Sequence, residues 1–154
     1  MRAVVQRVSS ASVQEEGQVV ATIGAGFLVL LGATHGDSLA TAQTVAAKVA
    51  GLRLFGDAGG RMNLGLKDVD GSILCVSQFT LYGDVRKGRR PSFEEAAGAA
   101  VAEPLYDAFC RAVEALGVPC QRGVFGAGMV VSLANDGPVT LIVDSAGLSG
   151  SSSA

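Results

Sequence analysis

The feature that most constrains the fold is a continuous apolar run, GFLVLLGAT, at residues 26–34. An uninterrupted run of this length is typical of a strand that is buried on both faces, because a half-exposed strand would alternate apolar and polar side chains. A second run, SILCVSQFTL at residues 72–81, predicts another central strand. The chain is therefore expected to fold around a sheet whose middle strands are covered by other elements.

Shorter strand patterns flank these two runs. Residues 2–8 predict a strand, and residues 11–14 and 18–23 predict a hairpin around the sequence EEG. Near the C-terminus the sequence NDGPVT, residues 135–140, separates two further apolar runs and predicts a turn between two strands. Asp-Gly is a strong hairpin signal because glycine tolerates a positive φ.

Helical patterns occupy the intervening segments. Asp37 and Ser38 can cap a helix that runs to about Leu52, with apolar residues at helical spacing. Ser92 and Glu95 have the spacing of a capping box and predict the start of a second helix. A third helix is expected over residues 103–116. The order of strands, helix, strand, helices and strands predicts an α+β fold with a mixed or barrel-like sheet.

Size and composition indicate one globular domain. The chain has 154 residues, of which 49% are hydrophobic and 17% are charged, so a sizeable core is expected and disorder is not. The domain is expected to cover residues 1–146, followed by a flexible tail, GLSGSSSA, at residues 147–154. No apolar run approaches the roughly 20 residues that span a bilayer, and the N-terminus lacks a signal-peptide pattern. These features predict a cytoplasmic protein with no membrane partner.

The supply of reactive side chains excludes several classes of enzyme. His35 is the only histidine, so a hydrolase with a histidine base would have to use it, and a surface position is the more common role. The three cysteines lack the spacing of a zinc set and are expected to be reduced thiols. Neither a metal nor a cofactor is expected. Any chemistry must then use hydroxyl groups, backbone amides or the substrate itself.

The sequence SQFTL ends the second central run and places Ser77, Gln78, Phe79 and Thr80 at a strand end. One interpretation is a strand end with two polar side chains facing solvent. The other is a pocket rim at which backbone N–H groups form an oxyanion hole. Thr80 could act as a nucleophile only weakly, because no base is visible beside it.

A basic loop follows, although the net charge of the chain is −2 and no global field attracts nucleic acid. The loop can be a solvated surface, or it can bind phosphate through charge and guanidinium forks. A phosphate role predicts binding that weakens with salt. Its four cations are Arg86, Lys87, Arg89 and Arg90.

Three stretches together carry a family resemblance. The opening MRAVVQRV, the segment SQFTLYGD…KGRRPSF and the segment FGAGMVVSLANDGPVT closely resemble D-aminoacyl-tRNA deacylase, over Met1 to about Asp144. Two motifs within these stretches, SQFTL and GPVT, are specific in combination, and a sister family that edits L-alanine mischarged on tRNA carries PQATL-like and NGPYT-like versions of them. Ser77, Phe79 and Val139 match the D-specific side. The resemblance implies a barrel-like α+β fold that works as a homodimer with its active site at the subunit interface.

The resemblance also implies how substrates are selected. In that family the Gly-Pro bond is cis, and the unit enters the pocket of the other subunit, which excludes an L side chain. Gly137 and Pro138 match that unit, and Arg7 matches an arginine that braces it, although Arg7 could also be an exposed strand residue. Phe125 and Met129 match positions that shape the pocket for the terminal adenosine, with core packing as the alternative. Glycine has no side chain to exclude, so glycyl-tRNA(Ala) is expected as a substrate beside D-aminoacyl-tRNA.

The implied chemistry is RNA-assisted ester hydrolysis, in which the vicinal ribose hydroxyl helps activate water and the amides near Phe79 and Thr80 stabilise the oxyanion. The competing hypothesis makes the Thr80 hydroxyl the nucleophile. Two further alternatives are a non-catalytic tRNA- or RNA-binding protein and a dimeric protein in which the Gly137-Pro138 turn is only structural.

Overall fold

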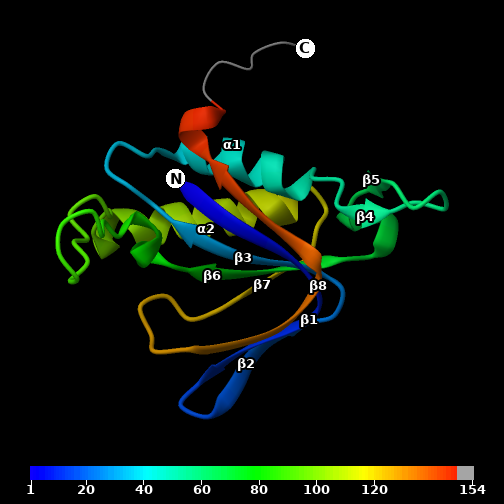
Figure 1. Cartoon of the computed structure of the whole chain (residues 1–154), viewed down its shortest axis with the longest axis horizontal. Helices are drawn as coiled ribbons and strands as arrows, with labels where there is room; N and C mark the ends of the chain where they lie inside the picture. Colours follow the sequence, from blue (N-terminus) through cyan, green and yellow to red (C-terminus); the bar gives the residue numbers. More distant parts are fainter. Residues whose placement is uncertain (149–154) are drawn as a thin grey trace.

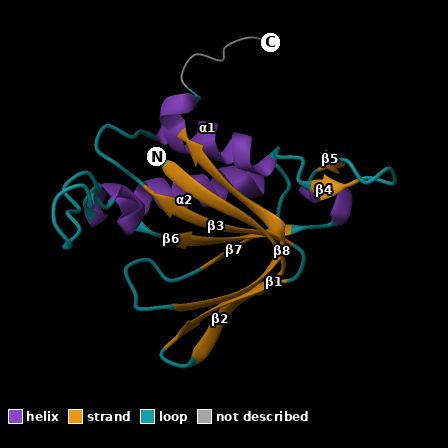
Figure 2. Cartoon of the chain, in the orientation of Figure 1, coloured by secondary structure: helices purple, strands orange, loops and turns teal. Residues whose placement is uncertain are grey.

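The structure is a computed structural model that describes residues 1–148, and it contains one curved, mixed six-stranded sheet (Figures 1 and 2). The strands follow the order β2-β1-β3-β6-β7, and β8 pairs with the long strand β1. Their bounds are β1 Arg2–Glu15, β2 Gln18–Ile23, β3 Gly26–Gly32, β6 Ser72–Ser77, β7 Cys120–Arg122 and β8 Val130–Asp144.

Strand β1 gives the sheet its curvature because its two halves have different neighbours. The first half pairs antiparallel with β3, with Arg2 opposite Gly32, and the second half pairs with β2, with Ala11 opposite Ile23. Strand β8 follows β1 along nearly its whole length. The second halves of β1 and β8 therefore curl away with β2 (Figure 2), which produces a nearly closed, barrel-like sheet. The predicted α+β fold is confirmed.

Two α-helices, α1 (Leu39–Ala50) and α2 (Ala99–Ala115), cover one face of the sheet. Helix α1 begins where the sequence predicts, because the Ser38 hydroxyl accepts a hydrogen bond from the Thr41 amide and the Thr41 hydroxyl accepts one from the Ser38 amide. The smaller elements are β4 (Phe55–Gly56) and β5 (Met62–Leu64), which form a separate hairpin, and the 3-10 turns η1 (Leu66–Val69), η2 (Phe79–Tyr82) and η3 (Ser145–Gly147).

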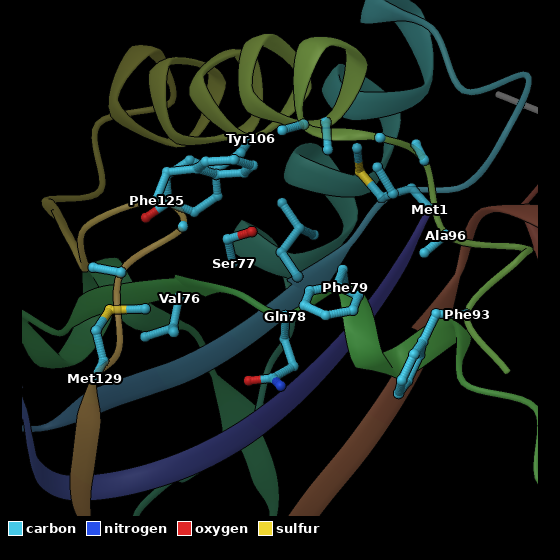
Figure 3. Close-up of a pocket in the computed structure, with 18 of the residues that line it drawn as sticks. Met1, Val76, Ser77, Gln78, Phe79, Phe93, Ala96, Tyr106, Phe125 and Met129 are labelled. Carbon is cyan, nitrogen blue, oxygen red and sulfur yellow. The ribbon is translucent and has the colours of Figure 1, made fainter. Parts of the chain in front are cut away.

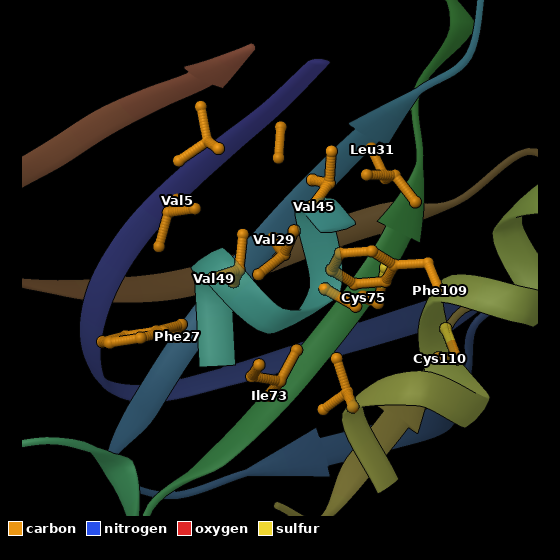
Figure 4. Close-up of a cluster of buried hydrophobic side chains, with 14 of the residues drawn as sticks. Val5, Phe27, Val29, Leu31, Val45, Val49, Ile73, Cys75, Phe109 and Cys110 are labelled. Atoms are coloured by element: carbon orange, nitrogen blue, oxygen red, sulfur yellow. The ribbon is translucent and has the colours of Figure 1, made fainter. Parts of the chain in front are cut away.

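The core explains the two continuous apolar runs. Phe27, Val29 and Ile73 point toward the helices and pack with α1 and α2 side chains such as Val45 and Phe109 (Figure 4). The alternate residues of the same strands point into the barrel and form a second apolar cluster, which includes Leu28, Leu74 and Val76. Both faces of β3 and β6 are therefore buried, as predicted.

The segment after β6 differs from the predicted continuous strand over residues 72–81. Strand β6 ends at Ser77, and the chain turns into η2, in which the Leu81 amide donates to the Gln78 carbonyl oxygen at 3.2 Å. The reason is that the pairing with β3 ends here, with Leu31 opposite Ser77, so the residues after Ser77 have no neighbouring strand to bond with on that side. The Gln78 amide makes the last bond, to the Leu31 carbonyl oxygen at 2.8 Å.

The predicted helix start at Ser92 and Glu95 is also wrong. The Ser92 amide and carbonyl both bond to Asp84, at 2.9 and 2.7 Å, and this pairing closes the base of the basic loop. A residue held in a two-way bridge is not free to cap a helix. Helix α2 begins only at Ala99, and it ends at Ala115, close to the predicted end of the third helix.

The sequence NDGPVT does not form a hairpin turn. Strand β8 continues through it, and both of its halves pair with β1. The pairing jumps from Gln6 opposite Thr140 to Val8 opposite Asn135, so β8 accommodates extra residues as a bulge facing Arg7. The predicted domain boundary at residue 146 stays a prediction. Residues 149–154 of the predicted tail lie outside the described residues.

Candidate active site

A cavity of about 620 Å³ lies between the end of β6 and helix α2 (Figure 3). Most of its lining is apolar, and its polar side chains come from the end of β6. The structure brings together five of the residues predicted from the sequence, Ser77, Gln78, Phe79, Phe125 and Met129. A concave apolar site with a few converging polar groups is the usual form of a small-ligand site.

The polar edge of this pocket is made where β6 ends. Ser77 is the last residue paired with β3, opposite Leu31. Within residues 1–148, neither the Phe79 amide nor the Thr80 amide donates a hydrogen bond to the protein, because the strand ladder has ended and η2 has only begun. Thr80 does not line the pocket, but its hydroxyl accepts a hydrogen bond from the Gln78 side-chain amide at 2.5 Å.

Two aromatic rings form the far wall of the pocket. The ring centroids of Tyr106 and Phe125 are 5.9 Å apart, and Met129 lies near them (Figure 3). The Tyr106 hydroxyl donates to the Cys75 carbonyl oxygen at 2.7 Å, which fixes the ring against β6. Burial raises the pKa of this hydroxyl far above its usual value, so Tyr106 stays protonated and acts as a hydrogen-bond donor.

A second aromatic pair lies at the mouth. Phe79 and Phe93 meet edge to face, with centroids 5.3 Å apart and ring planes at 72°, and Phe79 is 54% exposed. The segment after Phe93 is held by the loop between β3 and α1, where a ring nitrogen of His35 lies 2.8 Å from the Glu94 carbonyl oxygen. The only histidine is therefore used to fix a backbone segment and does not line the pocket.

The residues predicted to select the substrate lie elsewhere in the chain. Gly137 and Pro138 belong to the exposed bulge of β8, and the peptide bond between them is cis. Arg7 contacts this bulge, since its Nε donates to the Asp136 carbonyl oxygen at 2.8 Å. None of these residues lines the pocket of its own chain.

The four loop cations also lie outside the pocket, and they are not equivalent. The Arg86 guanidinium donates two hydrogen bonds to the Asp84 carboxylate, at 2.9 and 2.7 Å. These hydrogen bonds lower the pKa of Asp84 to about 2. Within residues 1–148, Lys87, Arg89 and Arg90 form no ion pair. These three carry the charge that remains available for an anion.

Sequence reasoning missed most of the apolar lining of the pocket, and the largest side chains among the missed residues are Met1, Phe93 and Tyr106. Phe93 directly follows the basic loop, and its place beside Phe79 depends on the Asp84–Ser92 bridge. Tyr106 follows Leu105 on the apolar face predicted for the last helix, which was a usable signal. Among residues 1–148, no group of three or more His, Cys, Asp or Glu side chains is arranged to hold a metal ion, and no helix is long and apolar enough to cross a membrane.

In the part of the chain that the structure describes, this α+β domain places an aromatic cavity beside two strand-end amides that donate no hydrogen bond to the protein. A family model described as D-Tyr-tRNA(Tyr) deacylase matches residues 4–144. The D-aminoacyl-tRNA deacylase of Thermomicrobium roseum is 59% identical over 152 residues, which cover 99% of each chain. That of Thermus aquaticus is 58% identical over 145 residues, covering 94% of this chain and 95% of the relative. The chain belongs to the D-Tyr-tRNA(Tyr) deacylase family.

Solved structures give the same fold. The c-Myc DNA unwinding element binding protein superimposes with a TM-score of 0.88 at 39% identity, covering 94% of this chain and 98% of that one. A probable eukaryotic D-amino acid tRNA deacylase has a TM-score of 0.80 at 19% identity, covering 92% and 97%. The second comparison supports the fold alone.

Proposed function

We propose that this protein hydrolyses the ester bond of D-aminoacyl-tRNA and releases the D-amino acid and free tRNA in the cytoplasm. The observation that carries the proposal is the pair of unpaired amides at Phe79 and Thr80, at the end of β6 beside an aromatic pocket. Because the chain belongs to the deacylase family, we infer that the ester carbonyl of an aminoacyl-tRNA is the group that these amides bind. Donors fixed before the reaction are effective in ester hydrolysis because they need no rearrangement as charge develops.

The proposed mechanism uses the backbone and the substrate. The terminal adenosine stacks against Phe125 and Tyr106 with Met129 beside them, since aromatic and thioether groups suit the face of a base. The ester carbonyl then lies near the β6 end, where the two amides stabilise the negative charge of the tetrahedral intermediate. The vicinal hydroxyl of the terminal ribose helps activate the attacking water. No side-chain base is required.

The proposed chiral filter comes from a second subunit. Gly137 and Pro138 are exposed and lie outside the pocket of their own chain, so a role in substrate selection requires them to reach the pocket of a partner. Strand β8 offers a surface for such pairing, because it carries exposed apolar side chains, including Ile142 at 71% exposure. In a homodimer with twofold symmetry, each bulge would close the other pocket. This wall would exclude L side chains and admit both D-aminoacyl and glycyl esters, including glycyl-tRNA(Ala).

A mixing experiment tests this arrangement. Phe125→Ala removes one ring of the proposed adenosine wall, and Gly137→Ala distorts the bulge because an added Cβ would lie 2.0 Å from the Val139 nitrogen. Each variant alone is expected to lose D-selective hydrolysis. Co-refolded in equal amounts, half of the dimers carry one native pocket facing one native bulge, which restores roughly a quarter of the wild-type rate. No recovery, with dimers present by light scattering, would overturn action in trans.

The alternative is a non-catalytic nucleic-acid-binding protein that uses the same pocket and basic loop. The name of the solved relative at 39% identity, a DNA unwinding element binding protein, is the observation that favours it. This alternative predicts binding of tRNA or DNA without release of an amino acid from any ester. Stoichiometric binding with no turnover of D-aminoacyl-tRNA would support it against the deacylase.

A further inference from the structure

The aromatic pair at the pocket mouth lies next to the two amides that are proposed to stabilise the oxyanion. Phe79 begins the turn η2, and its ring meets that of Phe93 edge to face, with the centroids 5.3 Å apart (Figure 3). Because Phe79 is 54% exposed, burial in the core does not fix its position. The contact with the Phe93 ring is therefore important for holding this residue in place.

The restraints on η2 are strongest at its end. There, Tyr82 is buried, and the Leu81 carbonyl oxygen accepts a hydrogen bond from the Arg2 guanidinium at 2.9 Å. At the start of the turn, the Gln78 carbonyl oxygen accepts a hydrogen bond of 3.2 Å from the Leu81 amide, which is at the long end of the usual range. A ring that packs against Phe79 supplies a further restraint at this exposed start.

Phe93 is itself fixed by backbone hydrogen bonds on both sides. Ser92, just before it, pairs with Asp84 in both directions, at 2.9 and 2.7 Å. Just after it, the Glu94 carbonyl oxygen lies 2.8 Å from a ring nitrogen of His35, in the loop between β3 and α1. The Phe93 ring is therefore attached to two other parts of the domain, so it can act as a fixed support for η2.

The Phe93 ring also packs on the backbone at the end of η2. Gly83 follows the turn, and its amide donates to the Thr80 carbonyl oxygen at 2.9 Å. A Cβ placed on Gly83 would lie 3.0 Å from Cε1 of Phe93 and 3.0 Å from that same oxygen. The lack of a side chain at Gly83 is what lets the ring approach so closely. Phe93 thus contacts η2 on both sides of the Thr80 amide.

We propose that Phe93 is a positioning residue for ester hydrolysis, whose ring holds η2 so that the Phe79 and Thr80 amides face the ester carbonyl. The proposal rests on the proposed function. Donors in an oxyanion hole act at about 2.7–3.1 Å from the oxygen that develops charge, so a small shift of η2 weakens them. Because this charge develops in the transition state, the shift should lower kcat and leave substrate binding nearly unchanged.

The test is hydrolysis of D-tyrosyl-tRNA by the full-length Phe93→Leu and Phe93→Tyr variants. Leucine keeps an apolar side chain but lacks the ring, and it should lower kcat at least about ten-fold while KM stays within about two-fold of the wild type. Tyrosine keeps the ring and is the matched control, which should retain kcat within about two-fold. Urea unfolding shows whether each variant is folded.

Gly83→Ala is a second variant that displaces the ring without removing it. The backbone at Gly83, with φ −66° and ψ 132°, suits alanine, so the expected disturbance comes from the close contacts of the new Cβ. It should also lower kcat with little change in KM. In both Phe93→Leu and Gly83→Ala, the ¹H–¹⁵N signals of the Phe79 and Thr80 amides should move, whereas in Phe93→Tyr they should stay close to those of the wild type.

Other outcomes overturn separate claims. A rise in KM with unchanged kcat in Phe93→Leu would show that Phe93 binds the substrate directly, and it would refute the positioning role. An unchanged kcat, equal losses in the leucine and tyrosine variants, or a lower kcat with unmoved amide signals would refute it as well. Absence of hydrolysis by the wild-type protein would refute the proposed function, and the amide signals would still show whether Phe93 fixes η2.

Discussion

The Nε atom of Arg7 donates a hydrogen bond to the main-chain oxygen of Asp136 at 2.8 Å, directly opposite the bulge of β8. A terminal nitrogen of the same guanidinium bonds to the Leu54 carbonyl oxygen, just before the β4–β5 hairpin. The Arg7 side chain is only 15% exposed. One side chain therefore ties together the strand, the bulge and the hairpin, and the position of Gly137 and Pro138 depends on it.

Arg7→Lys should weaken both folding and selectivity. Lysine keeps the charge but presents a single ammonium group, which cannot reproduce the guanidinium fork to two carbonyl oxygens. We expect the free energy of unfolding to fall by about 1–3 kcal/mol, because a largely buried acceptor loses its partner. We also expect the ratio of D- to L-tyrosyl-tRNA hydrolysis to fall. Urea unfolding and matched ester assays measure the two effects, and an unchanged ratio would separate Arg7 from chiral selection.

Thr80→Ala distinguishes the two mechanisms. If the backbone amides carry catalysis, the hydroxyl only orients the Gln78 side chain, and kcat should stay within about three-fold of the wild type. Thr80→Ser, which keeps the hydroxyl, is the control. Single-turnover hydrolysis of D-tyrosyl-tRNA gives the rate directly. Collapse of the alanine variant with full activity in the serine variant would instead indicate a nucleophilic hydroxyl.

Tyr106→Phe should cost stability while keeping the aromatic wall. The substitution removes the donor to the Cys75 carbonyl oxygen, which keeps a second donor in the Gly123 amide. The expected loss is about 1 kcal/mol in the free energy of unfolding, since the acceptor is not left unsatisfied. The KM for tRNA should change little, because the ring beside Phe125 remains. A large rise in KM would show that the hydroxyl itself contacts the substrate.

Neutralising the loop cations should reduce the dependence of tRNA binding on salt. Each phosphate contact contributes about 0.7–0.9 to the slope of log K against log salt. Lys87→Gln and Arg89→Gln should therefore each lower that slope by close to this amount if they touch the RNA backbone. Arg86→Gln should have a smaller effect because Asp84 already pairs with Arg86. Equal effects of all three substitutions would mean that this pair opens when RNA binds.

The lowered pKa of Asp84 leads to a prediction about how the stability of the folded protein changes at acidic pH. Its pKa is lowered to about 2 by hydrogen bonds from Arg86, so its contribution to folding is present above the ordinary value of 3.8 and is lost as pH falls through about 2. In Arg86→Gln the pKa should return toward 3.8. Carboxyl NMR titration of both proteins measures it. The same low pKa in the variant would assign the shift to another group.

The sequence anticipates the parts of this molecule that are determined by local pattern. The double-faced burial of residues 26–34 and the Ser38 cap follow from apolar continuity and from capping chemistry. The end of β6 cannot be predicted in this way, because it depends on the residue at which the hydrogen bonding between β3 and β6 stops. The NDGPVT segment is misleading for the same reason. Its turn residues are real, but pairing with one long strand, β1, turns a predicted hairpin into a bulge.

In the candidate site, too, the residues in local motifs could be predicted, and those placed by long-range contacts could not. Motif residues such as Gln78 and Phe125 are found in the sequence and meet in the pocket. Met1 and Phe93 carry no signal of their own, because they reach the pocket only through long-range contacts. For Phe93 these are the bridge at Ser92 and the His35 contact with Glu94, which joins two loops 59 residues apart.

The most direct test of the central claim is hydrolysis of matched D- and L-tyrosyl-tRNA by the purified protein, with and without EDTA. We predict rapid release of D-tyrosine, little release of L-tyrosine, and no effect of the chelator, because backbone amides and the substrate ribose carry the chemistry. Release of neither amino acid by a folded protein that binds tRNA would contradict the account and favour a non-catalytic binding protein.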